Sequence, residues 1–277
     1  MGMVLSVIIV NYNGRKQLKA CFDSLYAQLS DIDFEIIVVD NNSSDDSCGF
    51  ITESYPDVRL IQSPENLGFG RGNNIGVANA VSDLVLLLNN DTILLDSPLP
   101  AIRNLLANPD YGVITINMLD ANSNYIPAIG RFPTPLRLVK LSLLNDTREA
   151  FISGKFDTGT DYKADWVTGS FMLMRRRDFE SVGGFDSDYF MYVEDVDLCK
   201  KLADIGKSSI FMPAMRYIHF VGFRPANENM LTEGYRIYVH KHFTQMQALT
   251  ARLMLSLNMF IKKLKAITGM DKPRRPR

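Results

Sequence analysis

The chain has 277 residues, of which 46% are hydrophobic and 10% aromatic, and its formal net charge is −1. This composition supplies a sizeable core, in one large domain or two intimate halves, and it excludes extensive disorder. Acidic and basic residues are nearly equal in number and form no basic stripe, so we expect no nucleic acid partner.

The first hundred residues alternate between apolar runs and helical patterns. Continuous apolar runs are typical of strands buried on both faces, and they predict strands at residues 5–10, 34–39, 58–62 and 83–88. Helical spacing predicts helices at residues 16–29 and 72–81. This order predicts an α/β fold with a parallel sheet and right-handed crossovers. Residues 1–10 lack a basic leader and a cleavage site, so we interpret them as strand and not as signal peptide.

Polar residues stand at the ends of three of these strands. They are Asn11, Asp40 and the run Asn89-Asn90-Asp91. Ligands bind beyond the carboxyl ends of parallel strands, so three polar ends on one edge of a sheet favour a binding site. The preference of Asn and Asp for turns would explain a single such end.

A glycine-rich segment lies between the third and fourth predicted strands. Gly68, Gly70 and Gly72 are separated by single residues, which is not the spacing of a dinucleotide-binding fingerprint. We interpret the segment as a loop where the backbone passes close to a nucleotide, with Asn73 or Asn74 forming hydrogen bonds.

The remainder of the chain shows a mixed α+β pattern. We expect a short helix at residues 98–108, a loop at 122–135, strands at 111–117, 164–167, 171–175 and 208–212, and a helix over 232–267.

Residues 183–199 are the most informative segment, because they place five carboxylates among glycines and aromatic residues directly before a helical pattern. Glu194 and Asp195 fall near the start of that helix, where the helix dipole and free N–H groups favour an ionised carboxylate. Such a group beside an aromatic wall has the character of a general base for a sugar hydroxyl. The alternative is that Asp195 is an N-cap and Asp197 a first-turn charge.

Six segments together resemble the motifs of family 2 glycosyltransferases of the GT-A fold. They are residues 6–13, 36–45, 65–74, 86–91, 166–170 and 183–198, and they occur in the family's order between about Ser6 and Val221. The chain is most similar to the bacterial rhamnosyltransferase-like members. The resemblance implies a mostly parallel central sheet flanked by helices, and transfer of a hexose from a nucleotide diphosphate sugar to an acceptor hydroxyl with inversion.

The resemblance also assigns roles on the donor side. It places Asp40 on the nucleobase or ribose, Asn11 in the same pocket, and Asp91 on a divalent cation, Mg²⁺ or Mn²⁺, that bridges to the diphosphate. Asn89 stands where the family's DxD motif has its first Asp, and it is left to bind the ribose or a metal-bound water. His219 stands where some members supply a further metal ligand; the alternative is a core histidine on a strand.

On the acceptor side, the resemblance places Trp166 at the wall of the site, where an indole face can stack on a sugar; the alternative is core packing. Tyr192 is close in sequence to Asp195, and we expect it to bind the acceptor. Asp195 is the expected base, with Glu194 as its neighbour or replacement. The expected acceptor is a glycan or a lipid-linked glycan, in the synthesis of cell-surface polysaccharide.

We divide the chain into a glycosyltransferase domain at 1–225 and a helical extension with a basic tail at 226–277. Residues 1–99 form the nucleotide-sugar half of the domain and residues 100–225 the acceptor half. Residues 246–265 combine apolar and basic side chains, so this helix either contacts an anionic membrane or packs on the domain or on a second subunit, as in a homodimer. Three isolated cysteines favour a reducing compartment, so we expect the cytoplasm, at or near the inner face of the cell membrane.

Two other functions are compatible with parts of the pattern. A non-catalytic nucleotide-sugar-binding protein would keep the pocket, and Asn89 leaves room for it. A nucleotidyltransferase with a similar sheet would need a glycine-rich basic loop after the first strand, and residues 11–14 do not form one.

Overall fold

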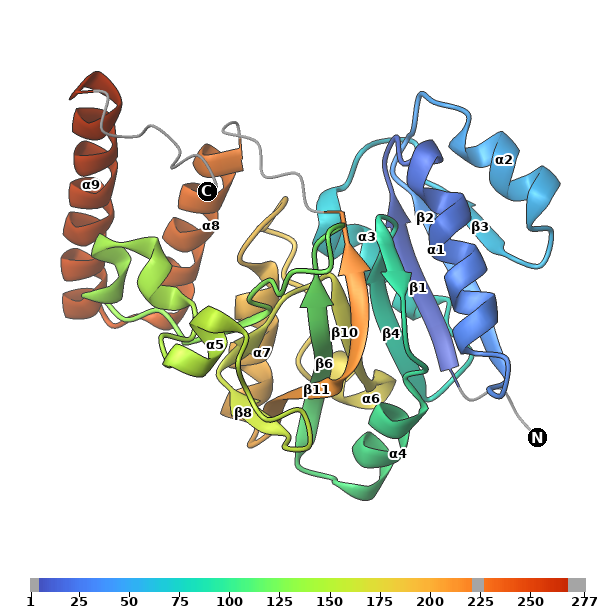
Figure 1. Cartoon of the computed structure of the whole chain (residues 1–277). Helices are drawn as coiled ribbons and strands as arrows, with labels where there is room; N and C mark the ends of the chain where they lie inside the picture. The colour runs from blue at the N-terminus through green and yellow to red at the C-terminus, as the bar shows by residue number, and fades with distance from the viewer. Residues whose placement is uncertain (1–4, 221–226, 269–277) are drawn as a thin grey trace.

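The computed structural model of the protein describes residues 5–220 and 227–268. Within these residues a nine-stranded mixed sheet forms the centre of the molecule (Figure 1). Its strands are β1 (Leu5–Asn11), β2 (Phe34–Asp40), β3 (Arg59–Gln62), β4 (Leu84–Asn89), β5 (Thr92–Leu94), β6 (Tyr111–Leu119), β8 (Tyr162–Ala164), β10 (Phe171–Arg175) and β11 (Ser208–His219). They are ordered β3-β2-β1-β4-β10-β6-β11-β5, with β8 paired to β11. A separate ribbon pairs β7 (Ile129–Gly130) with β9 (Trp166–Val167).

Helices cover both faces of the sheet. The helices α1 (Arg15–Gln28), α2 (Ser47–Ser54) and α4 (Leu99–Ala107) contribute to one core cluster, and α3 (Gly68–Ala78), α6 (Arg176–Ser181) and α7 (Glu194–Asp204) contribute to another. Beside the sheet lie α5 (Glu149–Ser153), the short 3-10 helices η1 (Arg137–Val139) and η2 (Leu141–Leu144), α8 (Asn227–His242) and α9 (Gln245–Thr268).

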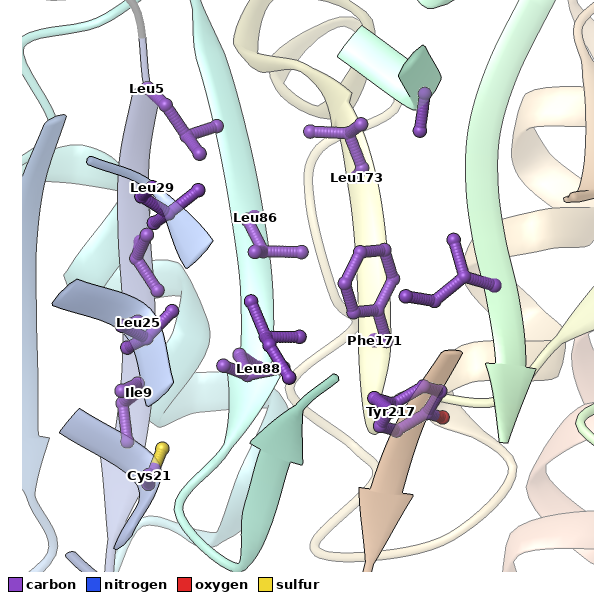
Figure 2. Close-up of a cluster of buried hydrophobic side chains, with 14 of the residues drawn as sticks. Leu5, Ile9, Cys21, Leu25, Leu29, Leu86, Leu88, Phe171, Leu173 and Tyr217 are labelled. Atoms are coloured by element: carbon purple, nitrogen blue, oxygen red, sulfur yellow. The ribbon is translucent and has the colours of Figure 1, made fainter. Parts of the chain in front are cut away.

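The strand pleat divides the apolar residues between the two core clusters. Leu5 and Ile9 of β1 join the cluster on the α1 face, while Ile8 joins the cluster on the α3 face. Figure 2 shows the α1 face, where Leu25 and Leu29 of α1 lie over β1, in the same cluster as side chains of β4 and β10. Both faces are buried, which explains why these strands read as continuous apolar runs.

The expected parallel half of the sheet is confirmed, and the remainder of the sheet is mixed. Strand β1 pairs in parallel with β2 and β4, and β2 pairs in parallel with β3. Strand β10 runs antiparallel between β4 and β6, and β11 is parallel to β6 but antiparallel to β5 and β8. The sheet as a whole is therefore less parallel than the sequence suggests.

The glycine-rich segment is the first part of helix α3 and not a loop. A Cβ added at Gly76 would lie 2.2 Å from Ile8 Cγ2, and one at Gly72 would lie 2.9 Å from both γ-methyl carbons of Val10. The spacing therefore serves the close approach of α3 to the buried strand β1, and the expected approach of this backbone to a nucleotide stays a prediction.

We expect Gly76→Ala to destabilise the protein by about 1–3 kcal/mol, the usual cost of inserting a methyl group into a packed core. The added Cβ meets Ile8, which has no exposed surface and no room to move. Gly159→Ala is the matched control, since its Cβ would lie at an ordinary 3.4 Å from Asp157 Oδ1. Chemical denaturation of both variants measures the difference; an unchanged midpoint for Gly76→Ala would contradict this packing role.

The expected single helix at residues 232–267 is two helices, α8 and α9, which turn at Phe243 and Thr244. A third core cluster joins them to the rest of the molecule through Tyr189 and Val196 on one side and Leu138 and Leu144 on the other. The expected domain boundary at residue 225 and most of the basic tail lie outside the described residues. None of the helices in the described ranges has the length and apolar character needed to cross a bilayer.

Candidate active site

The polar ends of β1, β2 and β4 meet at one edge of the sheet. In the strand register Asn11 pairs with Asp40, and Val10 pairs with Asn89. Asn11 is fully buried; its Nδ2 donates to Asp40 Oδ1 at 2.8 Å, and its Oδ1 accepts from Asn90 Nδ2 at 2.8 Å. These strand ends therefore form the continuous polar edge that the sequence predicts.

Asp40 is held at this edge by the loop that follows β2. The backbone N–H of Ser43 donates to Asp40 Oδ2 at 2.8 Å, and the Ser43 hydroxyl donates to Oδ1 at 2.6 Å. With Asn11 as a third donor, the carboxylate is fully engaged by the protein and has a fixed orientation. Its expected contact with the nucleobase or ribose stays a prediction.

Asp91 and His219 lie side by side although they are far apart in the sequence. After Asp91 the chain enters β5, which pairs antiparallel with the end of β11 and sets Thr92 opposite His219. Asp91 Oδ1 lies 3.1 Å from His219 Nε2, and Asn89 Nδ2 lies 3.2 Å from the same nitrogen. The pairing of the short strand β5 with β11 thus brings the DxD position to the histidine.

This group has the chemistry of a divalent cation site. Asp91 Oδ1 and His219 Nδ1 are buried, and neither has a properly directed hydrogen-bond partner among the described residues. A carboxylate, an imidazole and the Asn89 amide are oxygen and nitrogen donors of the kind that Mg²⁺ and Mn²⁺ accept. No cluster of three or more His, Cys, Asp or Glu ligands occurs in residues 5–220 and 227–268.

The acidic pair Glu194–Asp195 begins helix α7, directly after a strained turn. Tyr192 and Val193 both adopt left-handed backbone conformations, with φ of 72° and 73°. A β-branched residue such as Val193 is rarely found there, and such strain concentrates at functional sites. Gly234 of α8 supports the turn: a Cβ at that position would lie 2.6 Å from the Tyr192 carbonyl oxygen, so only glycine permits this approach.

Asp195 is oriented by two backbone donors. Its Oδ2 accepts from the N–H of Gly169 at 3.0 Å, and its Oδ1 accepts from the N–H of Val196 at 2.8 Å. Glu194 is 5% exposed, and its Oε2 has no hydrogen-bond partner among the described residues. The two carboxyl groups therefore have different environments despite being adjacent.

Both environments raise the pKa of the carboxyl group, but the opposing effect of hydrogen bonds differs between the two residues. Burial raises the pKa of Glu194 well above its ordinary value, and the neighbouring charge of Asp195 raises it further. Burial also raises the pKa of Asp195, but the N–H groups of Gly169 and Val196 oppose the rise. Asp195 is thus the group of the pair that keeps its negative charge more readily.

We expect Glu194→Gln to raise the melting temperature at pH 8 by about 2–4 °C, equivalent to about 1 kcal/mol. A carboxyl with a raised folded pKa binds more protons in the folded state, so its contribution to stability falls as pH rises through the interval between the unfolded and folded pKa values. The neutral amide avoids that loss. At pH 5 the two proteins should differ less.

Thermal denaturation at both pH values measures this effect, with Glu53→Gln as the control because Glu53 is exposed on α2. A lower melting temperature for Glu194→Gln at pH 8, or the same shift at both pH values, would show that Glu194 is not a destabilising buried acid.

The other three carboxylates of the acidic segment hold the segment in place. Lys241 Nζ lies 2.8 Å from Asp186 and 2.7 Å from Asp188. Asp197 is buried and contacts His242 Nε2 at 2.7 Å. Both partners come from the end of α8, so this helix secures the segment and leaves Glu194 and Asp195 facing the site.

One pocket of about 390 Å³ is lined both by Asn89, Asp91 and His219 and by the acidic pair Glu194–Asp195. It is lined by Phe69, Asn89, Asp91, Trp166, Thr168, Gly169, Ser170, Met191, Tyr192, Val193, Glu194, Asp195, Val196, His219, Leu231 and Tyr235. Seven of the residues singled out in the sequence are among them. The pocket therefore brings Asp91 and His219, the acidic pair and several aromatic side chains to one cavity.

Four other predicted residues do not line this pocket. Asn11 and Asp40 lie at the neighbouring strand ends. Asn73 is buried and donates to the Phe69 carbonyl at 3.0 Å. Asn74 exchanges two hydrogen bonds with the backbone of Phe185, at 2.8 and 2.9 Å, and so fastens α3 to the acidic segment. A nucleotide contact for Asn73 and Asn74 stays a prediction.

Trp166 packs in the core and also lines the pocket, and its expected stacking on an acceptor sugar stays a prediction. Its Nε1 donates to the Arg131 carbonyl at 3.0 Å, and the ring joins two core clusters, yet part of it faces the pocket. Packing thus fixes the plane of the indole that the pocket presents.

Sequence reasoning missed the contribution of α8 to the pocket. Leu231 and Tyr235 line it, and Tyr235 is almost fully buried. Burial and the charge of Asp195 both raise the pKa of the Tyr235 hydroxyl, so it stays protonated as a donor. The sequence places these residues in a separate extension, and no local signal ties them to Asp195.

Comparison with known proteins agrees with this arrangement. The model of the family described as glycosyl transferase family 2 matches residues 6–183. The rhamnosyltransferase WbbL of Escherichia coli is 30% identical over 253 residues, which cover 86% of this chain and 90% of that protein. The N-acetylglucosaminyl-diphospho-decaprenol L-rhamnosyltransferase of Mycobacterium tuberculosis is 27% identical over 234 residues, covering 78% of this chain and 76% of that protein.

A solved structure shares the fold. The mannosyltransferase PcManGT from Pyrobaculum calidifontis, in complex with GDP-Man and Mn²⁺, matches with a TM-score of 0.61 at 18% identity, over 95% of this chain and 75% of that chain. The family match ends at residue 183, before Glu194, Asp195 and His219. The roles expected for these three residues stay predictions.

Proposed function

The chain belongs to glycosyl transferase family 2 and has the GT-A fold, and from this membership we propose that its pocket transfers a sugar from a nucleotide diphosphate sugar to an acceptor hydroxyl, with inversion at the anomeric carbon. The observation that carries the proposal is the meeting of Asp91 and His219 with Asp195 in one pocket. The first two suit the diphosphate end of a donor, and the third suits the acceptor hydroxyl. Family membership removes the nucleotidyltransferase alternative.

In the proposed reaction Asp195 accepts the proton of the acceptor hydroxyl as that oxygen forms a bond to the anomeric carbon. The bond from this carbon to the donor diphosphate breaks on the opposite side, and the diphosphate leaves with the electron pair. Asp195 is suited to this role because two backbone N–H groups aim its carboxylate and help to keep it charged. Tyr192 and the indole of Trp166 would position the acceptor against it.

At the other end of the pocket Asp91 and His219 would hold a divalent cation, with Asn89 beside them. When bound, such a cation neutralises the charge that develops on the leaving diphosphate. The Mn²⁺ in the complex of the structurally similar mannosyltransferase supports this proposal.

We propose a 6-deoxyhexose of the rhamnose type as the transferred sugar. Both curated relatives described above are named rhamnosyltransferases. The pocket supports this donor, because Phe69, Met191 and Leu231 offer an apolar surface that suits a methyl group in place of a hydroxymethyl group. The proposed acceptor is a lipid-linked glycan, as the name of the mycobacterial relative indicates for that protein.

We place the reaction in the cytoplasm, at the inner face of the membrane. The nucleotide sugar and the three free cysteines, of which Cys21 and Cys199 are buried, support a reducing compartment. A lipid-linked acceptor would require that the pocket work close to a bilayer.

A panel of nucleoside diphosphate sugars, with and without Mg²⁺ or Mn²⁺, tests the proposed function. We expect release of the nucleoside diphosphate from rhamnosyl donors, dependent on the cation. Binding of a donor without hydrolysis or transfer would favour the non-catalytic alternative. Turnover that is unchanged by a chelator would refute the metal role, and inversion is read from the anomeric configuration of the product by NMR.

A further inference from the structure

Helix α9 has one side in the protein core and the opposite side in solvent. Ala251 and Leu255 are buried in the cluster shared with α8. Asn258 is also buried, and its Nδ2 donates to the carbonyl of Val139 in η1 at 2.8 Å. These contacts fix the rotation of α9 about its own axis, and so they fix which residues face outward.

The outward side of α9 carries a row of exposed apolar residues between Met246 and Leu264. Its exposed apolar residues are Met246, Leu249, Leu253, Leu257, Phe260 and Leu264, each between 40% and 77% exposed, and we call them the α9 outer face. They follow one another at intervals of three or four residues, which places them on one side of the helix. A continuous exposed apolar stripe of this size marks an interaction surface.

All charged residues between Gln245 and Met270 are basic. Between Gln245 and Thr268 the helix contains Arg252, Lys262, Lys263 and Lys265 and no acidic residue. Eight of the chain's 30 lysines and arginines, but only one of its 31 acidic residues, come after Thr244. The rest of the chain is therefore strongly acidic, and among the described side chains of α9 the basic residues Arg252 and Lys263 are exposed.

We propose that the α9 outer face docks on the surface of a bilayer that contains anionic phospholipid. An apolar stripe with basic residues beside it is the pattern of helices that lie in the membrane interface. Lipid headgroups of negative charge complement the basic residues, and they repel the acidic remainder of the protein, which orients the molecule on the surface.

The same charges disfavour a second copy of the chain as the occupant. Two-stranded helical interfaces place complementary acidic and basic residues beside the apolar seam. The described helix α9 offers only basic ones, so a symmetric pair of α9 helices would bring like charges together. Complementarity therefore favours the anionic lipid surface over self-association.

Helix α8 connects the docking face to the active site. It lies between α9 and the sheet (Figure 1), and its Tyr238 packs in the cluster shared with α9, while its Tyr235 lines the pocket. The carboxyl-terminal turns of α9 lie at the same end of the molecule as the carboxyl ends of β6 and β11 (Figure 1). Docking through α9 would therefore hold the pocket at a fixed height beside a membrane that carries the acceptor.

Vesicle flotation of the full-length protein tests the proposal without reference to catalysis. The first variant combines Leu249→Gln, Leu253→Gln and Phe260→Gln, since glutamine is a good helix former and these side chains make no buried contact. The matched control changes three equally exposed residues elsewhere: Leu106→Gln, Ile152→Gln and Ile205→Gln. The vesicles are pure phosphatidylcholine, or phosphatidylcholine with phosphatidylglycerol.

We expect the unchanged protein and the control to float with the anionic vesicles, and the triple variant of α9 to lose at least tenfold in partition. Binding should weaken between about 50 mM and about 500 mM salt, because screening weakens the attraction of basic residues to lipid. Arg252→Gln with Lys263→Gln should reduce both binding and its salt dependence. This charge variant leaves the packing of α9 untouched, so it tests the proposal even where the triple variant fails to fold.

Results of two kinds would overturn the proposal, one from flotation and one from the oligomeric state. The first is absence of flotation of the unchanged protein on anionic vesicles, or equal flotation of the triple variant. The second is a dimer of the unchanged protein that the triple variant converts to a monomer, measured by light scattering, because the face would then be a subunit interface. Transfer to a water-soluble acceptor should be unaffected in all variants, which separates this result from a failure of the proposed chemistry.

Discussion

Replacing Asp195 with asparagine is expected to lower the rate of sugar transfer by about two to four orders of magnitude, which is the usual contribution of a positioned general base. The amide keeps the shape of the carboxylate and can still accept one of the two N–H bonds from Gly169 and Val196. The fold and the cation group at the other end of the pocket should therefore survive. Initial rates measure the loss, and calorimetry should find donor affinity changed by no more than a few-fold.

The matched control is Asp188→Asn, in the same acidic segment. Asp188 contacts Lys241 and does not line the pocket, so we expect its rate to stay within about twofold of the unchanged protein. If Asp195→Asn retains half of the original rate, Asp195 is not the base, and Glu194 becomes the candidate. The pH dependence adds a second criterion. Since burial raises the pKa of Asp195, the rate should fall on acidification above the range of an ordinary aspartate.

The parallel half of the fold could be predicted from sequence because it is specified locally. Strands β1, β2 and β4 are buried on both faces, so each appears as an unbroken apolar run that ends at a polar residue. Their order and the known handedness of crossovers then place the three polar ends on one edge. Short strands such as β5 and β7 show no apolar run in the sequence. They form because they pair with strands that are distant in the sequence.

The glycine-rich segment shows how a local pattern can mislead. The spacing of Gly68, Gly70 and Gly72 indicates close approach of backbone to something, and the sequence alone does not say to what. In the structure the close neighbours are the side chains of β1 and of the acidic segment, including Val10 and Phe185. Close packing of a helix on a sheet requires glycine at the points of contact, just as close approach of the backbone to a nucleotide does.

The site could be predicted only in part for a related reason. Asp91 and His219 are united by the pairing of β5 with β11, which no spacing rule contains, and only the family resemblance brought them together beforehand. The acidic segment shows the reverse case. Its five carboxylates look alike in sequence, but Lys241 and His242 from α8 engage three of them and leave two for the pocket.

Replacing Asp91 with alanine is expected to weaken cation-dependent binding of a nucleoside diphosphate by an order of magnitude or more. Asn89 stands in place of the first DxD aspartate, so Asp91 is the one carboxylate beside His219, and its loss would leave only uncharged side chains there to hold a cation. Titration calorimetry of the nucleoside diphosphate, with and without Mg²⁺ or Mn²⁺, measures the difference. Asp96→Ala is the matched control, because Asp96 lies just beyond β5 but pairs with Arg216 at 2.8 Å and does not line the pocket.

A second variant at the same site is expected to strengthen the cation-dependent binding that Asp91→Ala weakens. The two variants together test whether a metal ion is involved. Asn89→Asp would add a second carboxylate beside Asp91 and His219, so cation-dependent affinity should rise, while binding without the cation should fall because two negative groups then face the diphosphate. The Asn89→Asp change in affinity for the nucleoside diphosphate would thus have opposite signs with and without the cation, and a bound cation accounts for that reversal. Equal affinity with and without the cation, in the unchanged protein and in both variants, would contradict the assignment of Asp91.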